Sequence, residues 1–356
     1  MSTEEERVLG YSEPHVCETK KFSVNAENLA LAGEILRRGG LVAFPTETVY
    51  GLGADALNEE AVRSVYRAKG RPSDNPMIVH IASREDLEGL VREVGKDAEK
   101  AMEAFWPGPL TIILPRSKQV PDTTTGGLDT VGIRMPGNET ARRLIEAARC
   151  PVAAPSANLS GKPSPTTAAD VLEDMDGRID AVLLGEDCDV GIESTVVDMT
   201  GEIPMILRPG YVTKEMLEEV LGKEVRYDPA LFRQPSGEDF HPRSPGMKYR
   251  HYAPEAEVCL YEGENLEAVR RAMAEAEKRA SALGRRTAVL DYGTDSRAAA
   301  HDFFAKLREL DREGYDLILV SGLKRESFGL SVMNRMTKAA GYEIVRVDET
   351  DASEEE

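Results

Sequence analysis

The chain has 356 residues, with 44 Lys and Arg against 63 Asp and Glu and a formal net charge of −19, and its length predicts about two domains. Residues 1–240 hold 26 Lys and Arg and 41 Asp and Glu, a net −15, which argues against stable direct binding of RNA because such binding depends on neutralising phosphates. The four Cys are scattered and form no CxxC pair, and the acidic N-terminal stretch lacks a secretory signal. The sequence also lacks an apolar run of about 18 residues. These features predict a cytoplasmic protein with no membrane contact.

Short apolar strands and helices alternate irregularly up to residue 227. After a flexible arm (1–20), a helix is expected over 27–38, closed by Gly39 and Gly40, and the cap Asn58 predicts a helix that ends at Lys69. The other helices are expected over 85–106 with a break near Gly95, over 139–149 and over 168–173, and strands over 41–45, 76–81, 109–115, 130–136, 150–156, 181–185, 194–200 and 205–210. Because many strands lack an intervening helix, the pattern predicts a mixed α/β sheet over 21–227.

Residues 228–254 interrupt this pattern, since they are rich in Pro and poor in aliphatic side chains. A loop of this length is either a linker or functional. Strands at 256–261, 287–292, 316–321 and 342–347 then alternate with helices at 265–283, 295–313 and 329–340, which predicts a small Rossmann-like parallel domain over 255–347. The acidic tail, 348–356, is expected to be flexible.

Several common site motifs are missing. "GLGADA" at 51–56 fits GxGxxA, but no helix opens directly after a strand and position 71 is Arg where an acid is needed, so we reject a dinucleotide site. The sequence has no GxxxxGK[ST], HExxH or GxSxG element, which disfavours P-loop proteins, zinc proteases and α/β-hydrolases.

Lys69 and Arg71 flank Gly70 at the end of a predicted helix, and this pair has two interpretations. Cations in a last helical turn favour the helix dipole, so they can simply cap the helix. Alternatively they hold an anion, because the stiff "PSDNP" segment that follows displays Asn75 in a fixed way and leads to His80 inside an apolar strand.

Further polar side chains follow other predicted strands, and each has a plain structural alternative as a turn or a satisfied core group. Ligands in α/β folds favour strand ends, and Arg134 inside an apolar strand needs a carboxylate from the protein or from a ligand. The candidates of this kind are Thr48, Arg134, Ser156, Asn158, Ser164, Ser194 and Arg208. Cations and neutral donors without a Ser-His-Asp or paired-carboxylate arrangement favour a phosphate-bearing ligand and chemistry by positioning, such as nucleotidyl transfer.

The motifs together resemble a known family. "KGR" at 69–71 with "SAN" at 156–158 matches the K-x-R…S-x-N signature of the YrdC-type domain, and "FPTETVYGLG", "DNPMIVHI", "WPGPLTIIL", "VGIRMP" and "ESTVVD" look like that family in the same order. "SPGMKYRHYAP" at 244–254 and "GLSVMNRMTKAAG" at 329–341 resemble the linker and tail of its two-domain type, L-threonylcarbamoyladenylate synthase. The resemblance covers roughly residues 21–345 and implies a twisted open sheet with a cationic concave face.

The resemblance implies that L-threonine, bicarbonate and ATP give threonylcarbamoyl-AMP and pyrophosphate, for modification of tRNAs that read ANN codons by a downstream threonylcarbamoyl transferase complex. Mg²⁺ is expected to come with ATP, on ligands that the sequence leaves unknown. Lys69 and Arg71 are the expected catalytic cations. The implied ATP residues are Lys69, Arg71, Asn75, Thr130, Ser156, Asn158, Ser164, Arg208, Tyr249 and His251, and the implied threonine residues are Thr48, His80, Arg134, Ala154 and Ser194.

The linker has a second expected role under this resemblance. It carries Lys248, Tyr249, Arg250 and His251 together, and we expect it to fold over the site as a lid that excludes water. Two alternatives stay open: an RNA-binding module that contacts tRNA directly, and a carbamoyl-transfer maturation factor, which the missing acylphosphatase and zinc-finger segments disfavour.

Overall fold

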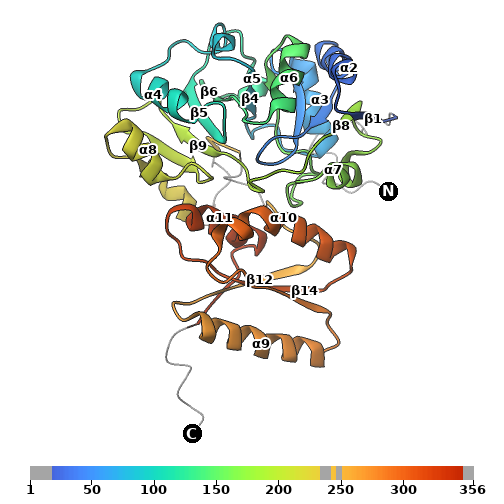
Figure 1. Cartoon of the computed structure of the whole chain (residues 1–356), viewed down its shortest axis with the longest axis vertical. Coiled ribbons are helices and arrows are strands. Elements are labelled where there is room, and N and C mark those ends of the chain that lie inside the picture. The colour runs from blue at the N-terminus through green and yellow to red at the C-terminus, as the bar shows by residue number, and fades with distance from the viewer. Residues whose placement is uncertain (1–17, 233–241, 246–250, 348–356) are drawn as a thin grey trace.

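A computed structural model describes residues 18–232, 242–245 and 251–347. The described residues form a large mixed sheet with helices on both faces and a separate four-stranded sheet near the C-terminus (Figure 1). This architecture confirms the predicted α/β class, a mixed open sheet followed by a Rossmann-like domain. None of the described helices combines the length and the apolar character of a membrane span.

The large sheet combines parallel and antiparallel neighbours, as the missing crossover helices predict. Its strand order is β1-β8-β2-β3-β7-β4-β6-β5-β9-β10-β11. The strands are β1 (Lys20–Ser23), β2 (Val42–Phe44), β3 (Gly51–Asp55), β4 (Ile78–His80), β5 (Leu110–Pro115), β6 (Thr130–Arg134), β7 (Val152–Ala153), β8 (Ala181–Leu184), β9 (Thr195–Asp198), β10 (Met205–Arg208) and β11 (Arg226–Tyr227).

Helices cover both faces of this sheet, because successive side chains of the buried strands point into two different cores. Val42 and Phe44 pack with α2 and α6, while Leu41 and Ala43 belong to the core on the other face. The helices of this domain are α2 (Ala26–Arg37), α3 (Glu59–Lys69), α4 (Lys96–Phe105), α5 (Asp122–Thr125), α6 (Glu139–Ala148), α7 (Ala168–Met175) and α8 (Lys214–Leu221), with 3₁₀ turns η1 (Arg84–Leu87) and η2 (Pro229–Phe232).

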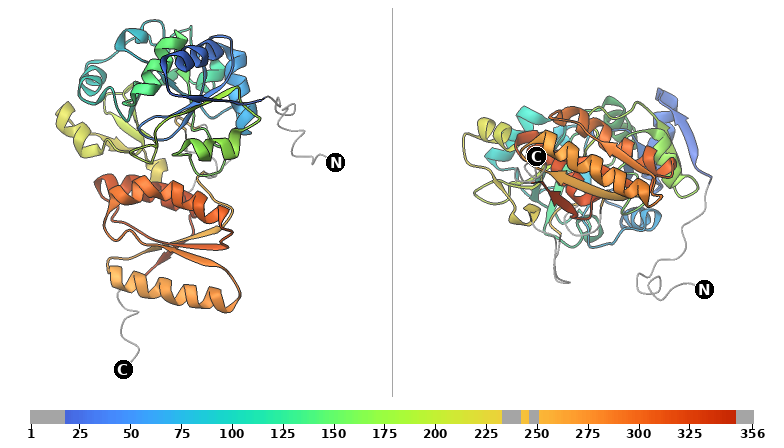
Figure 2. Two further views of the ribbon diagram at one scale, coloured as in Figure 1. Left: turned by 45° about the vertical axis from the view of Figure 1, so that its right-hand side comes forward. Right: turned by 90° about the horizontal axis from the view of Figure 1, so that it is seen from below.

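The second sheet is parallel throughout, with the order β13-β14-β12-β15. Its strands are β12 (Glu257–Glu262), β13 (Thr287–Leu290), β14 (Leu317–Ser321) and β15 (Ile344–Arg346), and its helices are α9 (Leu266–Ala282), α10 (Ser296–Arg312) and α11 (Ser327–Ala339). Helices α10 and α11 lie between this sheet and the large domain, whereas α9 covers the far face (Figure 2).

Buried arginines join the two domains. Arg308 on α10 donates through Nη2 to Asp174 on α7 at 2.7 Å and to the carbonyl of Pro163 at 2.7 Å, and both side chains of this ion pair are almost fully buried. Tyr252, at the end of the linker, stacks on Phe304 of α10 with ring centroids 5.0 Å apart. Charge and aromatic packing therefore fix the C-terminal domain against the large one.

Several local expectations differ from the structure, and the short elements β1, α5 and β11 were not expected. The helix expected over 85–106 is a 3₁₀ turn followed by α4, because Gly89 takes φ +83° and Val91 pairs with Arg116 instead of continuing a helix. Strand β3, in the "GLGADA" segment, was not expected; a Cβ at Gly53 would lie 2.8 Å from Val152, so glycine allows the neighbouring strand to approach. Helix α8 was also missed.

The ends and the linker are described only in part. Residues 1–17 and 348–356 of the expected flexible ends lie outside the described residues, while Thr19 is buried and Lys20 already pairs with Ala181 at the sheet edge. The expected boundaries at 227 and 255 fall between the last strand of the large sheet and the first strand of the small one.

Candidate active site

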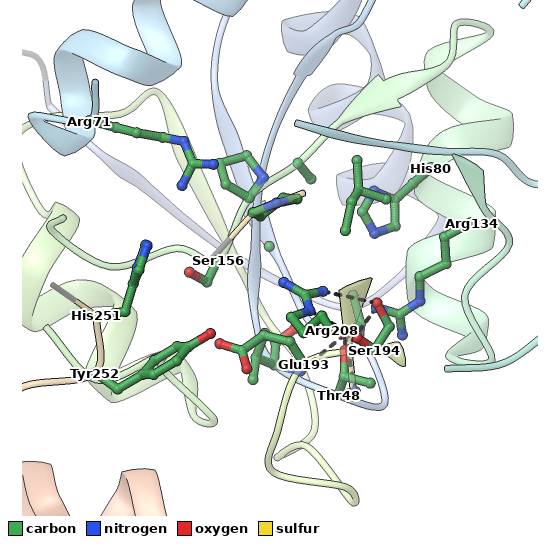
Figure 3. Close-up of a pocket in the computed structure, with 17 residues that line it drawn as sticks. Thr48, Arg71, His80, Arg134, Ser156, Glu193, Ser194, Arg208, His251 and Tyr252 are labelled. Carbon is green, nitrogen blue, oxygen red and sulfur yellow. Dashed lines mark hydrogen bonds between the residues drawn. The ribbon is translucent and has the colours of Figure 1, made fainter. Parts of the chain in front are cut away.

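A pocket opens where several strands of the large sheet end, beside the linker (Figure 3). Its cavity volume is about 60 Å³. The described lining residues are Thr46, Thr48, Val49, Gly51, Arg71, Ile78, His80, Arg134, Ala154, Pro155, Ser156, Glu193, Ser194, Arg208, Pro245, His251 and Tyr252.

One end of the pocket is built by the segment after α3. Gly70 ends this helix with φ +61°, which L-residues rarely adopt, and the chain then turns so that Arg71 faces the pocket. The guanidinium of Arg71 donates to the carbonyl of Pro76 at 3.0 Å. In Figure 3, Arg71, Ser156 and His251 lie on the same side of the pocket. The helix end therefore both caps α3 and directs a cation into the site.

Lys69 lies behind this end. Its Nζ donates to the backbone carbonyls of Ser156 and Asn158, and its side chain is buried. Burial, then the charge of Arg71, lowers the pKa of Lys69 well below its usual range. Ser156 Oγ in turn donates to Asn158 Oδ1 at 2.5 Å. Lys69 thus holds the loop that carries Ser156.

The opposite end of the pocket surrounds Arg134. Strand pairing places His80 of β4 beside Arg134 of β6. Arg134 donates to Thr48 Oγ1 at 2.9 Å and forms an ion pair with Glu47 at 2.7 Å, so the protein itself supplies the carboxylate that a buried Arg needs. Burial raises the pKa of Glu47, but the charge of Arg134 and a hydrogen bond from the Gly137 backbone together lower it below its usual value.

His80 is a neutral group at this end. Burial, then the charge of Arg134, lowers its pKa to about 3. Its Nδ1 is buried and has no hydrogen-bond partner among the described residues. A ligand at this end can therefore use a neutral imidazole nitrogen in addition to the hydroxyl of Thr48.

Ser194 and Arg208 lie between the two ends, at the start of β9 and the end of β10. Arg208 donates to the Ser194 carbonyl at 3.0 Å and to its Oγ at 3.2 Å, and Ser194 Oγ also lies 2.8 Å from Thr111 Oγ1. Burial lowers the pKa of Arg208 to about 10, so it stays charged at neutral pH. The described part of the lining therefore has three arginines along the length of the pocket.

Glu193 is the one acidic side chain among the described lining residues. It accepts a hydrogen bond from Ser164 Oγ at 2.5 Å and pairs with Arg335 of α11 at 2.9 Å. Burial raises its pKa, but the charges of Arg335 and Arg208 and the hydrogen bond from Ser164 outweigh burial and lower it to about 2. The hydroxyl of Tyr252 points toward the same carboxylate (Figure 3).

The described residues offer no dedicated metal site in or near this pocket. They contain no cluster of three or more His, Cys, Asp or Glu side chains that could hold a metal ion. Glu193 is already bound to Arg335 and Ser164.

Comparison with known proteins gives the family. Residues 34–210 match a family described as telomere recombination (Sua5, YciO and YrdC), and residues 212–341 match the C-terminal domain of threonylcarbamoyl-AMP synthase. A threonylcarbamoyl-AMP synthase of Pyrococcus abyssi is 47% identical over 330 residues, covering 90% of this chain and 96% of the relative. The chain belongs to the threonylcarbamoyl-AMP synthase family.

Two further comparisons agree with this membership. A threonylcarbamoyl-AMP synthase of Bacillus subtilis is 42% identical and covers 92% of this chain and 97% of the relative. A crystal structure of P. abyssi Sua5 complexed with L-threonine superposes with a TM-score of 0.88 at 45% identity, covering 93% of this chain and 100% of that one. The fold and both domains are thus those of the family.

The pocket brings together nine of the fifteen residues expected from the sequence: Thr48, Arg71, His80, Arg134, Ala154, Ser156, Ser194, Arg208 and His251. Five others lie elsewhere in the described structure. Lys69, Asn158 and Ser164 bind residues of the lining, Asn75 is buried next to Arg71, and Thr130 lines a neighbouring pocket with Ile78 and Pro245. Tyr249 lies outside the described residues.

Sequence reasoning missed Glu47, Glu193 and Tyr252 as parts of the synthase-family site. Glu47 stands between Thr46 and Thr48 in "PTET", and Glu193 directly precedes Ser194, so both lie next to residues that were selected. Arg335 stands in the C-terminal motif "GLSVMNRMTKAAG", but its partner lies 142 positions earlier in the chain. A pattern of local spacing carries no signal for such a pair.

Proposed function

We propose that this protein is a threonylcarbamoyl-AMP synthase that joins L-threonine, bicarbonate and ATP to give threonylcarbamoyl-AMP, pyrophosphate and water. The observation that carries the proposal is the charge distribution in the pocket. Arg71 stands at one end, Arg134 at the other and Arg208 between them, with neutral donors beside each (Figure 3). All three reactants carry negative charge, so a site that gathers them has to be cationic along its length.

The two ends suit different substrates. Arg134, Thr48 and His80 suit the carboxylate, hydroxyl and amine of threonine, with Ala154 and Ser194 lining the same end. Arg71, Ser156 and His251 suit the nucleotide, with Arg208 reaching its phosphates. The other proposed ATP residues are Lys69, Asn75, Thr130, Asn158, Ser164 and Tyr249. Lys69 contributes by holding the loop that carries Ser156.

The reaction needs alignment more than proton transfer. Threonine's amine and bicarbonate give an N-carboxylate and release water. One oxygen of this carboxylate then bonds to the α-phosphorus while the bond from that phosphorus to the bridging oxygen of pyrophosphate breaks. The attacking oxygen is already anionic, so this step requires no general base. Arg208, which lies between the two ends, is placed to stabilise charge where they meet.

Mg²⁺ belongs to this proposal as part of the nucleotide substrate. The described lining residues leave it the phosphate oxygens and water as ligands, and no step above depends on a protein-bound metal ion. The product suits a downstream tRNA threonylcarbamoyl transferase complex, and we expect the reaction in the cytoplasm.

The linker closes the site in this proposal. Pro245, His251 and Tyr252 line the pocket, and His251 lies on the same side of it as Arg71. Burial, then the charge of Arg71, lowers the pKa of His251 to about 3, so it contacts a nucleotide as a neutral group. Deletion of 242–254 should weaken ATP binding and turnover; unchanged values would disprove the lid.

Pyrophosphate release from ATP tests the function directly. We expect release with L-threonine, bicarbonate and ATP together, and background release when either L-threonine or bicarbonate is omitted. Release independent of threonine would contradict the proposal. A tRNA filter-binding assay over a salt titration tests the RNA-binding alternative, since a direct RNA binder shows a steep loss of affinity with salt.

A further inference from the structure

Helix α11 of the C-terminal domain forms hydrogen bonds with the backbone beside Ser194 and Arg208, at the start of β9 and after the end of β10. Ser331 Oγ donates to the carbonyl of Gly210 at 2.8 Å. Arg335 donates through Nη1 to the carbonyl of Pro209 at 2.7 Å and through Nη2 to the carbonyl of Glu193 at 3.2 Å. Its Nε also pairs with the Glu193 carboxylate at 2.9 Å.

These contacts are buried, and they restrict the movement of the Arg335 side chain. The Arg335 side chain has no solvent exposure, and its guanidinium lies 5.9 Å from the ring centroid of Tyr252. At the turn after β10, a Cβ on Gly210 would lie 2.4 Å from the Thr195 backbone nitrogen, so the turn packs directly against the start of β9. A shift of Arg335 is therefore transmitted to both Glu193 and the turn after Arg208.

The negative charge of Glu193 lies near the positive charges of Arg335 and Arg208. Glu193 is ionised at neutral pH because Arg335 and Arg208 both act on it. With Arg335 present, Glu193 has a direct ion partner at 2.9 Å, while Arg208 keeps its hydrogen bonds to Ser194. Without Arg335, the buried Glu193 carboxylate would keep Ser164 and the charges of Lys338 and Arg208, and it would then compete with the phosphates for Arg208.

We propose that Arg335 is a positioning residue of the active site: by pairing with Glu193 it keeps Arg208 available to the nucleotide. This inference rests on the proposed function, since it takes ATP as the ligand of Arg208. It gives the C-terminal domain an indirect part in nucleotide binding, since the described pocket lining includes no residue of that domain beyond the linker.

Binding of a non-hydrolysable ATP analogue to the full-length protein, measured by calorimetry, tests the proposal. For Arg335→Met we expect about ten- to a hundredfold weaker binding, the factor that one hydrogen bond to a charged group corresponds to. Threonine binding, which depends on Arg134 at the other end, should change by less than about threefold.

Two further variants separate charge from packing. Glu193→Gln removes the opposing charge and keeps an oxygen for Ser164, so we expect ATP affinity at least equal to that of the wild type. The double variant Glu193→Gln with Arg335→Met should recover ATP affinity to within about threefold of Glu193→Gln. A merely structural role of Arg335 would give no such recovery.

Arg312→Gln is the matched control. Arg312 lies on α10 at the same domain interface and pairs with Asp170 at 2.9 Å and Glu173 at 3.1 Å, neither of which lines the pocket. Its ATP affinity should match the wild type. Equal weakening in Arg312→Gln, or a double variant as weak as Arg335→Met, would overturn the proposal. Failure of the proposed function would show separately, as threonine-independent pyrophosphate release by the wild type.

Discussion

Replacing Lys69 with Met tests what the buried ammonium does. For Lys69→Ala, the sequence alone predicts loss of turnover with a nearly unchanged melting temperature, as for a residue that only touches a ligand. The structure changes the second half of that prediction. Lys69 Nζ donates to two backbone carbonyls, those of Ser156 and Asn158, and Met keeps the apolar stem but leaves both carbonyls without this donor.

The expected magnitude follows from these contacts. A hydrogen bond from a charged donor contributes about 1.5–3 kcal/mol, and two that share one ammonium do not add fully. The cost of burying the ammonium, which is removed with it, offsets part of the loss. We therefore expect the free energy of unfolding to fall by about 2–3 kcal/mol, which corresponds to a decrease of roughly 5–10 °C in melting temperature.

Urea unfolding and the pyrophosphate assay check both consequences in the same preparation. Lys162→Met is the control, because Lys162 lies in the same loop with a half-exposed side chain, and its partner Asp174, 3.5 Å away, keeps the shorter ion pair with Arg308. A Lys69→Met protein that loses turnover with unfolding free energy within error of the wild type would refute the argument that Lys69 holds the loop.

The remaining predictions concern the threonine end and the turn after β10. The pKa of His80 is about 3 in the folded protein and about 6.5 in the unfolded chain, so only the unfolded state takes up a proton as pH falls below about 6.5. Between pH 7.5 and pH 5, urea unfolding should therefore show that the wild type loses about 2 kcal/mol more unfolding free energy than His80→Gln. An equal loss in both proteins would contradict a buried neutral His80. Arg134→Met should raise the KM for threonine by about tenfold or more, and it should destabilise the fold by about 3–5 kcal/mol because it leaves Glu47 buried and unpaired. The double variant Glu47→Gln with Arg134→Met should recover stability but not the KM. Recovery of both would argue against a contact between Arg134 and threonine. Gly210→Ala should reduce turnover at least about tenfold, since its Cβ would meet the Thr195 backbone at 2.4 Å, whereas Gly201→Ala, with no atom within 4 Å, should behave like the wild type.

Local sequence signals predicted the helix ends well. Asn58 caps α3 because its side-chain oxygen accepts hydrogen bonds from the backbone N–H groups of Glu60 and Ala61, and Gly70 ends the helix in the left-handed conformation, as the residue types indicate. The parallel C-terminal sheet also follows from the alternation of apolar strands with helices. These features depend on residues within a few positions of one another, which the sequence displays directly.

The strand order and the charge partners could not be predicted in this way. β3 contains two glycines, and its place between β2 and β7 depends on how closely Val152 and Phe44 approach Gly53. Arg134 was correctly expected to need a carboxylate, but that Glu47 supplies it depends on the fold. Glu193 and Arg335 are separated by 142 positions, so their pairing exists only in three dimensions.

The pair formed by Arg308 and Asp174 limits how this chain can be divided. Asp174 on α7 has no solvent exposure, and its arginine partner comes from α10 in the other domain. A fragment that ended before β12 would keep this carboxylate beside the loop of Ser156 and Asn158 but lose the guanidinium that neutralises it. In the intact chain, loss of Arg308 alone would leave the buried Asp174 with only the longer ion pair to Lys162 at 3.5 Å among the described residues, which should destabilise the fold by several kcal/mol. A substitution at Arg308 in one domain therefore requires a matching substitution at Asp174 in the other.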